Sequence, residues 1–385
     1  MNKTYVNIIC FICALVQGIV LVADQTLFRV VCNYLNVDNT TMWIGFFSSA
    51  FFIGMVVVAI ISGEIAERIG KKNVITLFCF VIVAGTLVLS FCTSPVAGLI
   101  GFVLIGLGFG AVEGMENALL VDVNSDSASI LNYNSVFFSA GAILSPLLIS
   151  GFLEGGGDWH FVYIVIIVLF VVLGILFAAA KVEKTVSAKQ VHVPKMVSVK
   201  LLKNKYFLLS CILIFIYLGA ESGATSWTSH IFDSTSFGAW ALAIFWAAMG
   251  ISRFIMARFC SKRTHTALSV FAALGIAGFA GIIFLHDNAA ASLVLFFLIG
   301  FGLGPHWPSY FSLGTDASGK YTGAAGGVIM FFSSLGGAVL SLVTGSFSGF
   351  QIMIICAVYM AAVLAVQRVF AYQEKREIIK QGTEQ

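Results

Sequence analysis

Apolar residues fall in twelve blocks along the chain, and each block is long enough, at ~1.5 Å per residue, to cross a bilayer as a helix. Windows of about 19 residues place the predicted helices near 6–30, 41–63, 73–92, 95–121, 129–152, 158–180, 206–230, 236–258, 266–285, 288–314, 320–346 and 348–370. The first block is longer than a signal-peptide core of about 7 to 15 residues, so we keep it as a helix. The pattern predicts an all-α integral membrane protein with twelve transmembrane helices.

One long polar segment, 181–205, interrupts this pattern in the middle of the chain and contains seven Lys and one Glu. It predicts four parts: an N-terminal six-helix bundle at 1–180, a cytoplasmic basic linker at 181–205, a C-terminal six-helix bundle at 206–370 and a cytoplasmic tail at 371–385. The chain therefore divides into two groups of six helices.

The two groups share sequence. LIGLGFG at 104–110 recurs as LIGFGLG at 298–304, and FFS at 137–139 recurs at 331–333, both at an offset of 194 residues. Duplicated membrane bundles are typical of secondary transporters, whose solute site lies between the repeats near the bilayer midplane. We therefore expect two pseudo-symmetric halves with a site between them.

Composition and charge fit a membrane location, since 59% of residues are hydrophobic and only 10% are charged. All Lys and Arg except Arg29 and Arg253 fall on one side of the predicted helices. Positive residues mark the cytoplasmic side, so both termini are predicted to be cytoplasmic. The short loops favour a bacterial cytoplasmic (inner) membrane, and we expect a monomer in the lipid bilayer with no nucleic-acid partner.

Motifs for enzymes and bound cofactors are absent from the sequence. There is no GxxxxGK[ST] phosphate loop, no GxSxG elbow and no HExxH zinc pair. The eight Cys are scattered through apolar segments without a CxxC pair, which indicates small buried side chains and no disulfide or metal site. We expect a protein that is not an enzyme and needs no cofactor.

Two glutamates stand inside a predicted helix. Glu113, Glu116 and Asn117 lie at i, i+3 and i+4, which places them on one face. A charge in the bilayer centre costs roughly 2.5 to 3.5 kcal/mol on insertion scales, so that face is expected to meet protein or water. The alternatives are that one Glu pairs with Arg253 or lies at a wet helix end.

A third acid, Asp24, lies in the first helix with no Lys or Arg within four residues. A low-dielectric cavity disfavours the charged form of a carboxyl group, which suits a group that loads and unloads protons. The alternatives are exposure at the outer mouth or a pair with Arg29.

Several stretches resemble a known family. The segment GEIAERIGKK at 63–72 resembles the signature of the major facilitator superfamily. A closer resemblance, to the fucose permease branch of fucose–glucose–galactose:proton symporters, rests on ADQTLF (23–28), GAVEGMEN (110–117), LNYNSVFFSAGAILSP (131–146) and YLGAESGATSW (217–227). Weaker similarities occur at 250–253 and 305–308. The resemblance implies the major facilitator fold and proton-coupled uptake of a sugar or sugar-like solute.

The resemblance also implies roles for single residues. Glu113 and Asn117 match a Glu-x-x-x-Asn pattern whose acid takes part in proton-coupled sugar binding, and Asp24 matches an acid that resembles a proton carrier. We therefore expect Asp24 and Glu113 to couple protons. Glu116 departs from the pattern, and Ser135 occupies a place where the family usually has His or Gln.

Amides and carboxylates suit sugar hydroxyls, while flat aromatic faces suit the apolar face of a pyranose. The residues expected to contact the solute are Glu116, Asn117, Asn134, Ser135, Glu221, Trp227, His306 and Trp307. Either tryptophan could instead anchor or fill a helix interface. His306, beside two prolines that must break or bend its helix, could relay protons or be structural.

A cytoplasmic gate is expected at the segment 63–72, interpreted as a loop after the second helix. The residues assigned to gating are Gly63, Glu67, Arg68, Lys71 and Arg253. Glu67 could pair with cations or a helix end across the cytoplasmic face in one conformation and release them in the other. The alternative is that the basic residues here only orient the chain in the membrane.

Two other functions remain open. A proton-driven exporter of drugs or metabolites would have the same fold, and GAILSP at 141–146 does not decide against it, although such exporters often carry a Gly-Pro-rich pattern in this helix. A non-transporting nutrient sensor commonly carries a long cytoplasmic segment, whereas the predicted tail is about 15 residues. Uptake is therefore the leading prediction.

Overall fold

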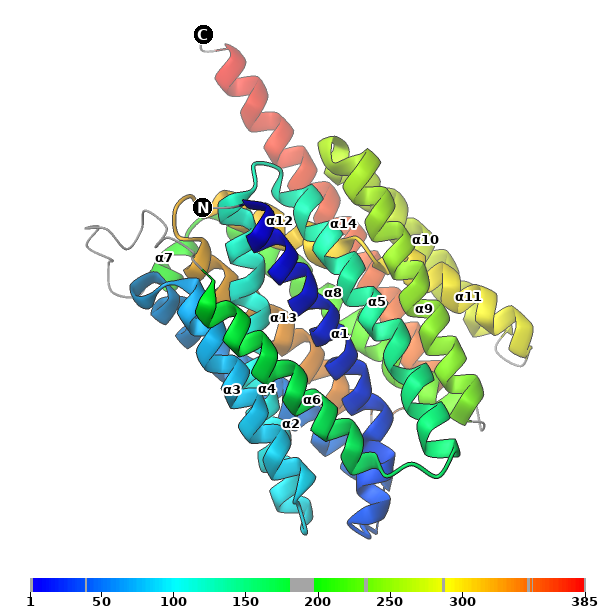
Figure 1. Cartoon of the computed structure of the whole chain (residues 1–385). Helices are drawn as coiled ribbons and strands as arrows, with labels where there is room; N and C mark the ends of the chain where they lie inside the picture. Colours follow the sequence, from blue (N-terminus) through cyan, green and yellow to red (C-terminus); the bar gives the residue numbers. More distant parts are fainter. Residues whose placement is uncertain are drawn as a thin grey trace.

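The computed structural model describes residues 3–38, 40–180, 197–231, 235–285, 288–344, 347 and 349–383, and helices account for nearly all of them (Figure 1). The first six helices are α1 (Lys3–Tyr34), α2 (Thr40–Ile69), α3 (Lys71–Ser90), α4 (Pro95–Val123), α5 (Ser127–Glu154) and α6 (Trp159–Ala179). A short helix α7 (Val197–Leu201) precedes α8 (Lys205–Ile231), α9 (Thr235–Ile255), α10 (Thr264–Leu285), α11 (Ala289–Leu303), α12 (His306–Ala317), α13 (Thr322–Thr344) and α14 (Gly349–Thr383). The described residues contain no strand.

Twelve membrane crossings follow from these helices. Eleven described segments are long and apolar enough to span a membrane, and one of them, Gly238–Leu285, is 48 residues long. At ~1.5 Å per residue this segment is far longer than one bilayer. A π turn at Met256–Cys260 and a 3-10 turn at Ser261–Arg263 divide it into α9 and α10. The predicted all-α fold with twelve transmembrane helices is confirmed.

Helix α4 shows how the sequence sets a helix start. Pro95 occupies the first turn, where no intrahelical N–H bond is required, and the Ser94 side chain accepts from Ala97 N. Gly70 separates α2 from α3 with φ of 90°, a conformation that side chains other than Gly rarely adopt. The prediction of a loop at 63–72 was therefore wrong: 63–69 belong to α2 and Lys71 begins α3.

The helices form two halves, α1–α6 and α8–α14; α11 and α12 together make one crossing, Ala290–Ala317, so each half has six crossings. In the first half α1 packs on α5 and α2 on α4, and in the second α8 packs on α13 and α14. The halves meet where α2 packs on α13 and where α5 packs on α9. An offset of 194 residues carries α2 onto α9 and α5 onto α13. The two contacts are thus equivalent under the repeat, and the prediction of pseudo-symmetric halves is confirmed.

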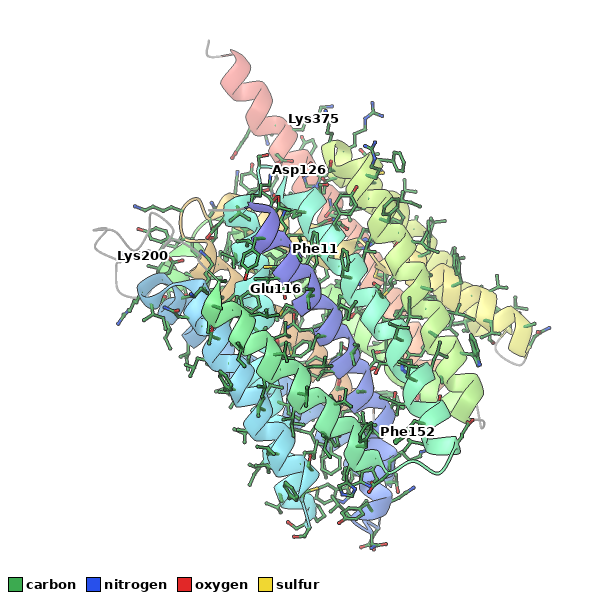
Figure 2. The ribbon with its side chains drawn as sticks, viewed as in Figure 1. Phe11, Glu116, Asp126, Phe152, Lys200 and Lys375 are labelled. Carbon is green, nitrogen blue, oxygen red and sulfur yellow. The ribbon has the colours of Figure 1, made fainter. Side chains whose placement is uncertain are left out.

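Both chain termini lie at the same end of the bundle, which we call the terminal end, and the opposite end is the far end (Figure 1). The labelled Asp126, Lys200 and Lys375 lie at the terminal end, and Phe152 lies toward the far end (Figure 2). The predicted tail is helical, because α14 continues through Thr383. The predicted linker includes α7, and its residues 181–196 lie outside the described part.

Candidate functional site

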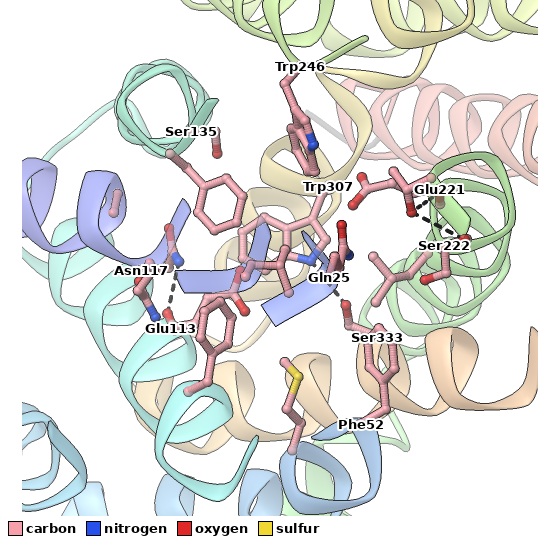
Figure 3. Close-up of a pocket in the computed structure, with 18 of the residues that line it drawn as sticks. Gln25, Phe52, Glu113, Asn117, Ser135, Glu221, Ser222, Trp246, Trp307 and Ser333 are labelled. Atoms are coloured by element: carbon pink, nitrogen blue, oxygen red, sulfur yellow. Dashed lines mark hydrogen bonds between the residues drawn. The ribbon is translucent and has the colours of Figure 1, made fainter. Parts of the chain in front are cut away.

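A cavity lies between the two halves, with an empty volume of about 780 Å³ that includes some open solvent. The N-terminal half contributes Ala14, Gln17, Leu21, Gln25, Phe51, Phe52, Met55, Phe109, Glu113, Asn117, Asn134, Ser135 and Phe138. The C-terminal half contributes Leu218, Glu221, Ser222, Thr225, Trp246, Arg253, Trp307 and Ser333. Its walls combine apolar side chains with polar groups from both halves (Figure 3).

The wall from the N-terminal half carries one acid and four amides, two of them from Gln17 and Gln25 on α1. Asn117 Nδ2 donates to the backbone oxygen of Glu113 at 2.8 Å, one helical turn back on α4. Asn134 Nδ2 on α5 donates to Asn117 Oδ1 at 3.3 Å. These bonds hold the amides at the cavity edge. The Glu113 side chain lines the cavity and forms no hydrogen bond or ion pair with the residues that the structure describes (Figure 3). The structure brings Glu113, Asn117, Asn134 and Ser135 together, as predicted.

The opposite wall carries a second acid and two indole rings. The Tyr217 hydroxyl donates to Glu221 Oε2 from one turn back on α8. Trp307 Nε1 donates to Ser333 Oγ at 3.0 Å, which fixes the ring against α13. Trp246 lines the same space from α9 (Figure 3). Glu221 and Trp307 therefore face the cavity from the C-terminal half.

Arg253 is the cation of the cavity lining, and backbone chemistry holds it there. A helix would pair the Gly304 carbonyl with the N–H of residue 308, but residue 308 is Pro and has no N–H. The chain breaks between α11 and α12, and the free carbonyl accepts from Arg253 Nε at 2.9 Å. The predicted break in this helix is confirmed.

The same guanidinium also reaches the other half. Arg253 Nη1 donates to Ser135 O at 3.1 Å and to Ser139 Oγ at 2.7 Å, both on α5. In the described part of the chain no carboxylate forms an ion pair with Arg253. Arg253 thus joins the halves through neutral acceptors, which excludes the alternative of a direct Glu113–Arg253 pair.

Asp24 lies in a smaller, adjoining cavity on α1. That cavity shares Leu21, Gln25, Phe51 and Phe52 with the main one and adds Asp24, Phe28 and Ser48. Asp24 is 2% exposed, and the polar side chain that faces it among the described residues is the Tyr163 hydroxyl of α6. Arg29 is exposed and forms no ion pair with Asp24. Asp24 is therefore neither at an open mouth nor paired with Arg29.

Two predicted solute contacts, Glu116 and His306, are not part of the cavity wall. Glu116 is fully buried inside the N-terminal half, where it bonds to Gln17 of α1 and Asn134 of α5. His306 is fully buried in the C-terminal half, where its ring stacks on Tyr217 at 5.7 Å. Trp227 belongs to α8, but its side chain lies outside the described residues.

Sequence reasoning missed several polar cavity residues: Gln17, Gln25, Ser222, Thr225, Trp246 and Ser333. Uncharged polar side chains are common in membrane helices and change a hydropathy average little. Two signals were available. Gln17 and Gln25 are the two glutamines of α1, and Ser333 is the partner of Ser139 at the 194-residue offset.

At the terminal end, the predicted gate segment contacts α13 of the other half. Glu67 Oε1 accepts from Ala324 N at 3.0 Å, in the first turn of α13, where N–H groups are free and the helix dipole favours an anion. A Cβ on Gly63 would come within 2.8 Å of Gly323 O, so only Gly permits this approach. Arg68 is exposed, and Arg253 lies in the cavity wall, away from this segment.

Two aspartates add matching bonds between the halves, which we call the aspartate contacts. Thr322 at the start of α13 donates to Asp122 Oδ1 at 2.5 Å, and Ser127 at the start of α5 donates to both oxygens of Asp316 at 2.9 Å. Asp122 and Asp316 are 194 residues apart. Lys71 also donates to Asp122, at 2.6 Å. The terminal end is therefore closed by bonds that follow the internal repeat.

Sequence comparisons give two distant relatives. The chain is 25% identical over 308 residues to bypass of stop codon protein 6 of Saccharomyces cerevisiae, matching 69% of this chain and 61% of that protein. It is 22% identical over 305 residues to the gentisate transporter of Corynebacterium glutamicum, matching 74% of this chain and 68% of that protein. The chain thus spans less than two thirds of the yeast relative.

Structure comparison gives the fold over nearly the whole chain. A structure of the E. coli fucose:proton symporter FucP matches with a TM-score of 0.76 and 17% identity, covering 96% of this chain and 98% of FucP. FucP in the outward conformation matches with a TM-score of 0.78 and 19% identity over the same shares. The family model of the Major Facilitator Superfamily matches residues 6–341. Two six-helix halves around a polar central cavity, together with this match, show that the chain is a transporter of the major facilitator superfamily.

Proposed function

We propose that this protein takes up a sugar or sugar-like solute together with protons, by alternating access of the central cavity to the two membrane faces. The observation that carries the proposal is the composition of that cavity. Glu113 and Asn117 line it from one half, and Glu221 and Trp307 line it from the other. A solute bound there would touch both halves, so its binding would bias how the halves sit against each other.

The chemistry of the walls suits an uncharged polyhydroxy solute. Carboxylates and amide oxygens accept from hydroxyl groups, and amide N–H groups donate to them. Trp246 and Trp307 offer flat apolar faces for the C–H face of a sugar ring. Glu113, Glu221 and Arg253 together carry one excess negative charge when both acids are ionised, which disfavours an anionic solute. The resemblance to fucose permeases and the fold of FucP support the same solute class.

Proton coupling would use Asp24 and Glu113. Asp24 lies ten residues from the far end of α1, whereas Glu113 lies ten residues from the terminal end of α4. The two cavities share four lining residues, so a proton entering from the far end would reach Asp24 before Glu113. A buried carboxyl group favours its neutral form, and loading both acids before the halves rock would lower the cost of enclosing them.

The gate would be the closed terminal end. The Glu67 bond to α13 and the two aspartate contacts all join opposite halves, so inward opening requires that they break. Closure at one end with a cavity between the halves supports a state that receives solute from the far end. With cytoplasmic termini, the far end faces the outside of a bacterial inner membrane.

Sidedness can be tested directly. A reporter fused after Gln385 is expected to be active only in its cytoplasmic form, because nearly all basic residues lie at the terminal end. The measurement is the activity of paired alkaline phosphatase and fluorescent protein fusions. Phosphatase activity at this position would reverse the proposed direction of entry.

Transport itself is tested with purified protein in liposomes that carry an imposed inward proton gradient. The probes are radiolabelled D-glucose, D-galactose and L-fucose, with protein-free liposomes as the control. Uptake of at least one probe above its external concentration, abolished by a proton ionophore, is the expected result. Proton-driven loss of a preloaded solute would instead indicate the exporter, and no response to any of the three sugars would overturn the proposed solute class.

A further inference from the structure

We infer that Glu116 is a positioning residue, which sets the orientation of two cavity amides, Gln17 and Asn134, without touching the solute. The inference rests on the proposed function, because it concerns which hydroxyl pattern the cavity accepts. Glu116 is 0% exposed and is not part of the cavity lining, whereas both amides are. A carboxyl group therefore stands directly behind two side chains that face the solute.

The hydrogen bonds of Glu116 set the orientation of the Gln17 and Asn134 amides. Glu116 Oε1 accepts from Asn134 Nδ2 at 2.7 Å. Glu116 Oε2 accepts from the Gln17 amide nitrogen at 2.6 Å, in the orientation in which the Gln17 oxygen also accepts from Glu113 N at 3.1 Å. Each carboxylate oxygen therefore receives one amide NH₂ group, one from α1 and one from α5.

This arrangement decides what the wall offers to a ligand. The two ends of an amide have nearly the same shape but opposite hydrogen-bonding character. Because the NH₂ group of Asn134 is used by Glu116 and Asn117, the oxygen Oδ1 is left over; it is closed to solvent and has no hydrogen-bond partner among the described residues. Asn134 lines the cavity, so the wall beside Glu113 holds an unpaired hydrogen-bond acceptor, which the hydroxyl of a bound solute would satisfy by donating.

Glu at position 116 orients the two amides better than Gln or Leu, which have a similar size. Ionised Glu accepts at both oxygens, so it can hold two NH₂ groups at once. Gln at this position would present one acceptor and one donor, and the donor would face the NH₂ group of Gln17 or Asn134. One amide would then have to turn over or lose its bond. Leu would hold neither amide.

The test is discrimination between a sugar and its deoxy analogues, measured as equilibrium binding to the purified full-length protein. The probes are whichever of D-glucose, D-galactose and L-fucose binds, and its monodeoxy analogues. In wild type, one analogue should bind at least about tenfold more weakly, because it leaves Asn134 Oδ1 unpaired. Asn134→Ala should bring this ratio to about one and so identify the hydroxyl concerned.

Glu116→Gln should reduce the same ratio to within about threefold. Adding Glu116→Gln to Asn134→Ala should leave the ratio of that variant at about one, since both substitutions act through one amide. Glu116→Asp keeps the charge but retracts it, and it should give an intermediate ratio. It also serves as the second variant if Glu116→Gln does not fold. Glu64→Gln is the matched control, because Glu64 binds Ser198 at 2.8 Å on the terminal side; its ratio should equal that of wild type.

The outcomes separate the two proposals. Wild type that binds none of the sugars overturns the proposed solute class, and the positioning role with it. Wild type that discriminates, together with a Glu116→Gln variant that discriminates equally well, overturns the positioning role alone. Weaker binding of every probe by the same factor in Glu116→Gln would show a merely structural role and would likewise overturn it.

Discussion

Replacing Glu113 with Gln is expected to abolish accumulation of solute against its gradient while exchange of solute across the membrane continues. Gln keeps the size and hydrogen bonding of a protonated Glu but cannot lose a proton. An inward gradient of one pH unit can sustain about tenfold accumulation per coupled proton, since about 1.4 kcal/mol corresponds to a factor of ten. In the variant this ratio should fall to about one. The measurement is uptake into proteoliposomes with the pH gradient, beside counterflow without it.

Asp24→Asn is expected to give the same loss of uphill transport, with counterflow remaining, because exchange requires no net proton movement. Binding of the solute by Glu113→Gln should depend less on pH than binding by wild type. Glu116→Gln is the control: it changes selectivity but should keep uphill transport. Undiminished accumulation in both Glu113→Gln and Asp24→Asn would exclude these acids as the coupling groups and direct attention to Glu221.

Removing both hydroxyl groups of the aspartate contacts, in Thr322→Val with Ser127→Ala, is expected to open the terminal end. A hydrogen bond to a charged group contributes about 1.5 to 3 kcal/mol, so each loss should shift the equilibrium by about tenfold or more. The two substitutions break equivalent bonds on opposite sides of the bundle. The change in the opening equilibrium constant of the double variant should therefore approach the product of the two single changes. Neither substitution touches the Lys71–Asp122 pair.

The shift can be measured as the rate at which a membrane-impermeant thiol reagent labels Ser222→Cys in inside-out vesicles, in a background where the partly exposed Cys260 is Ser. Ser222 lines the cavity, and the other native cysteines are buried. Labelling from the terminal side should rise strongly in the double variant. Thr315→Val is the matched control, because its hydroxyl bonds to Phe311 O within α12. Equal labelling of double variant and control would show that these bonds do not close the gate.

Much of the fold could be predicted because a bilayer constrains length and polarity so strongly. The predicted span 95–121 and the observed Pro95–Val123 differ by two residues. The helix ends were less predictable. Hydropathy falls where charges begin, so the second span was ended at 63, whereas backbone bonding carries α2 through Glu67 and Arg68 to Ile69. The charged last turns are helical because they extend beyond the bilayer, where polar side chains carry no penalty.

The site was predicted in part, and the miss at Glu116 has a geometric cause. Residues at i+3 and i+4 share a face with residue i but lie about 100° from each other around the helix axis. The cavity edge falls between them: Asn117 turns toward the cavity, and Glu116 turns toward α1 and α5. Sequence spacing gives the face, but only the packing of the neighbouring helices shows where that face ends.

His306 was misplaced for a different reason. The two prolines predicted a break or bend in the span 288–314, and the chain does break after Leu303 and resumes at His306. After the break, Trp307 faces the cavity, and His306, about 100° away around the helix axis, stacks on Tyr217. A proline pair predicts that a break occurs; it does not predict the angle at which the helix continues.

Because Arg253 bonds to Gly304 in its own half and to Ser135 and Ser139 in the other, it ties the halves together at the level of the cavity. The other bonds between the halves described above lie near the terminal end. When two halves rock against each other, contacts at the two ends form and break in turn, whereas contacts at the pivot persist. Arg253 therefore marks where the pivot would lie on the α5–α9 side. The Gly304 carbonyl, left without a helical partner by Pro308, would hold Arg253 at that pivot while the two halves rock.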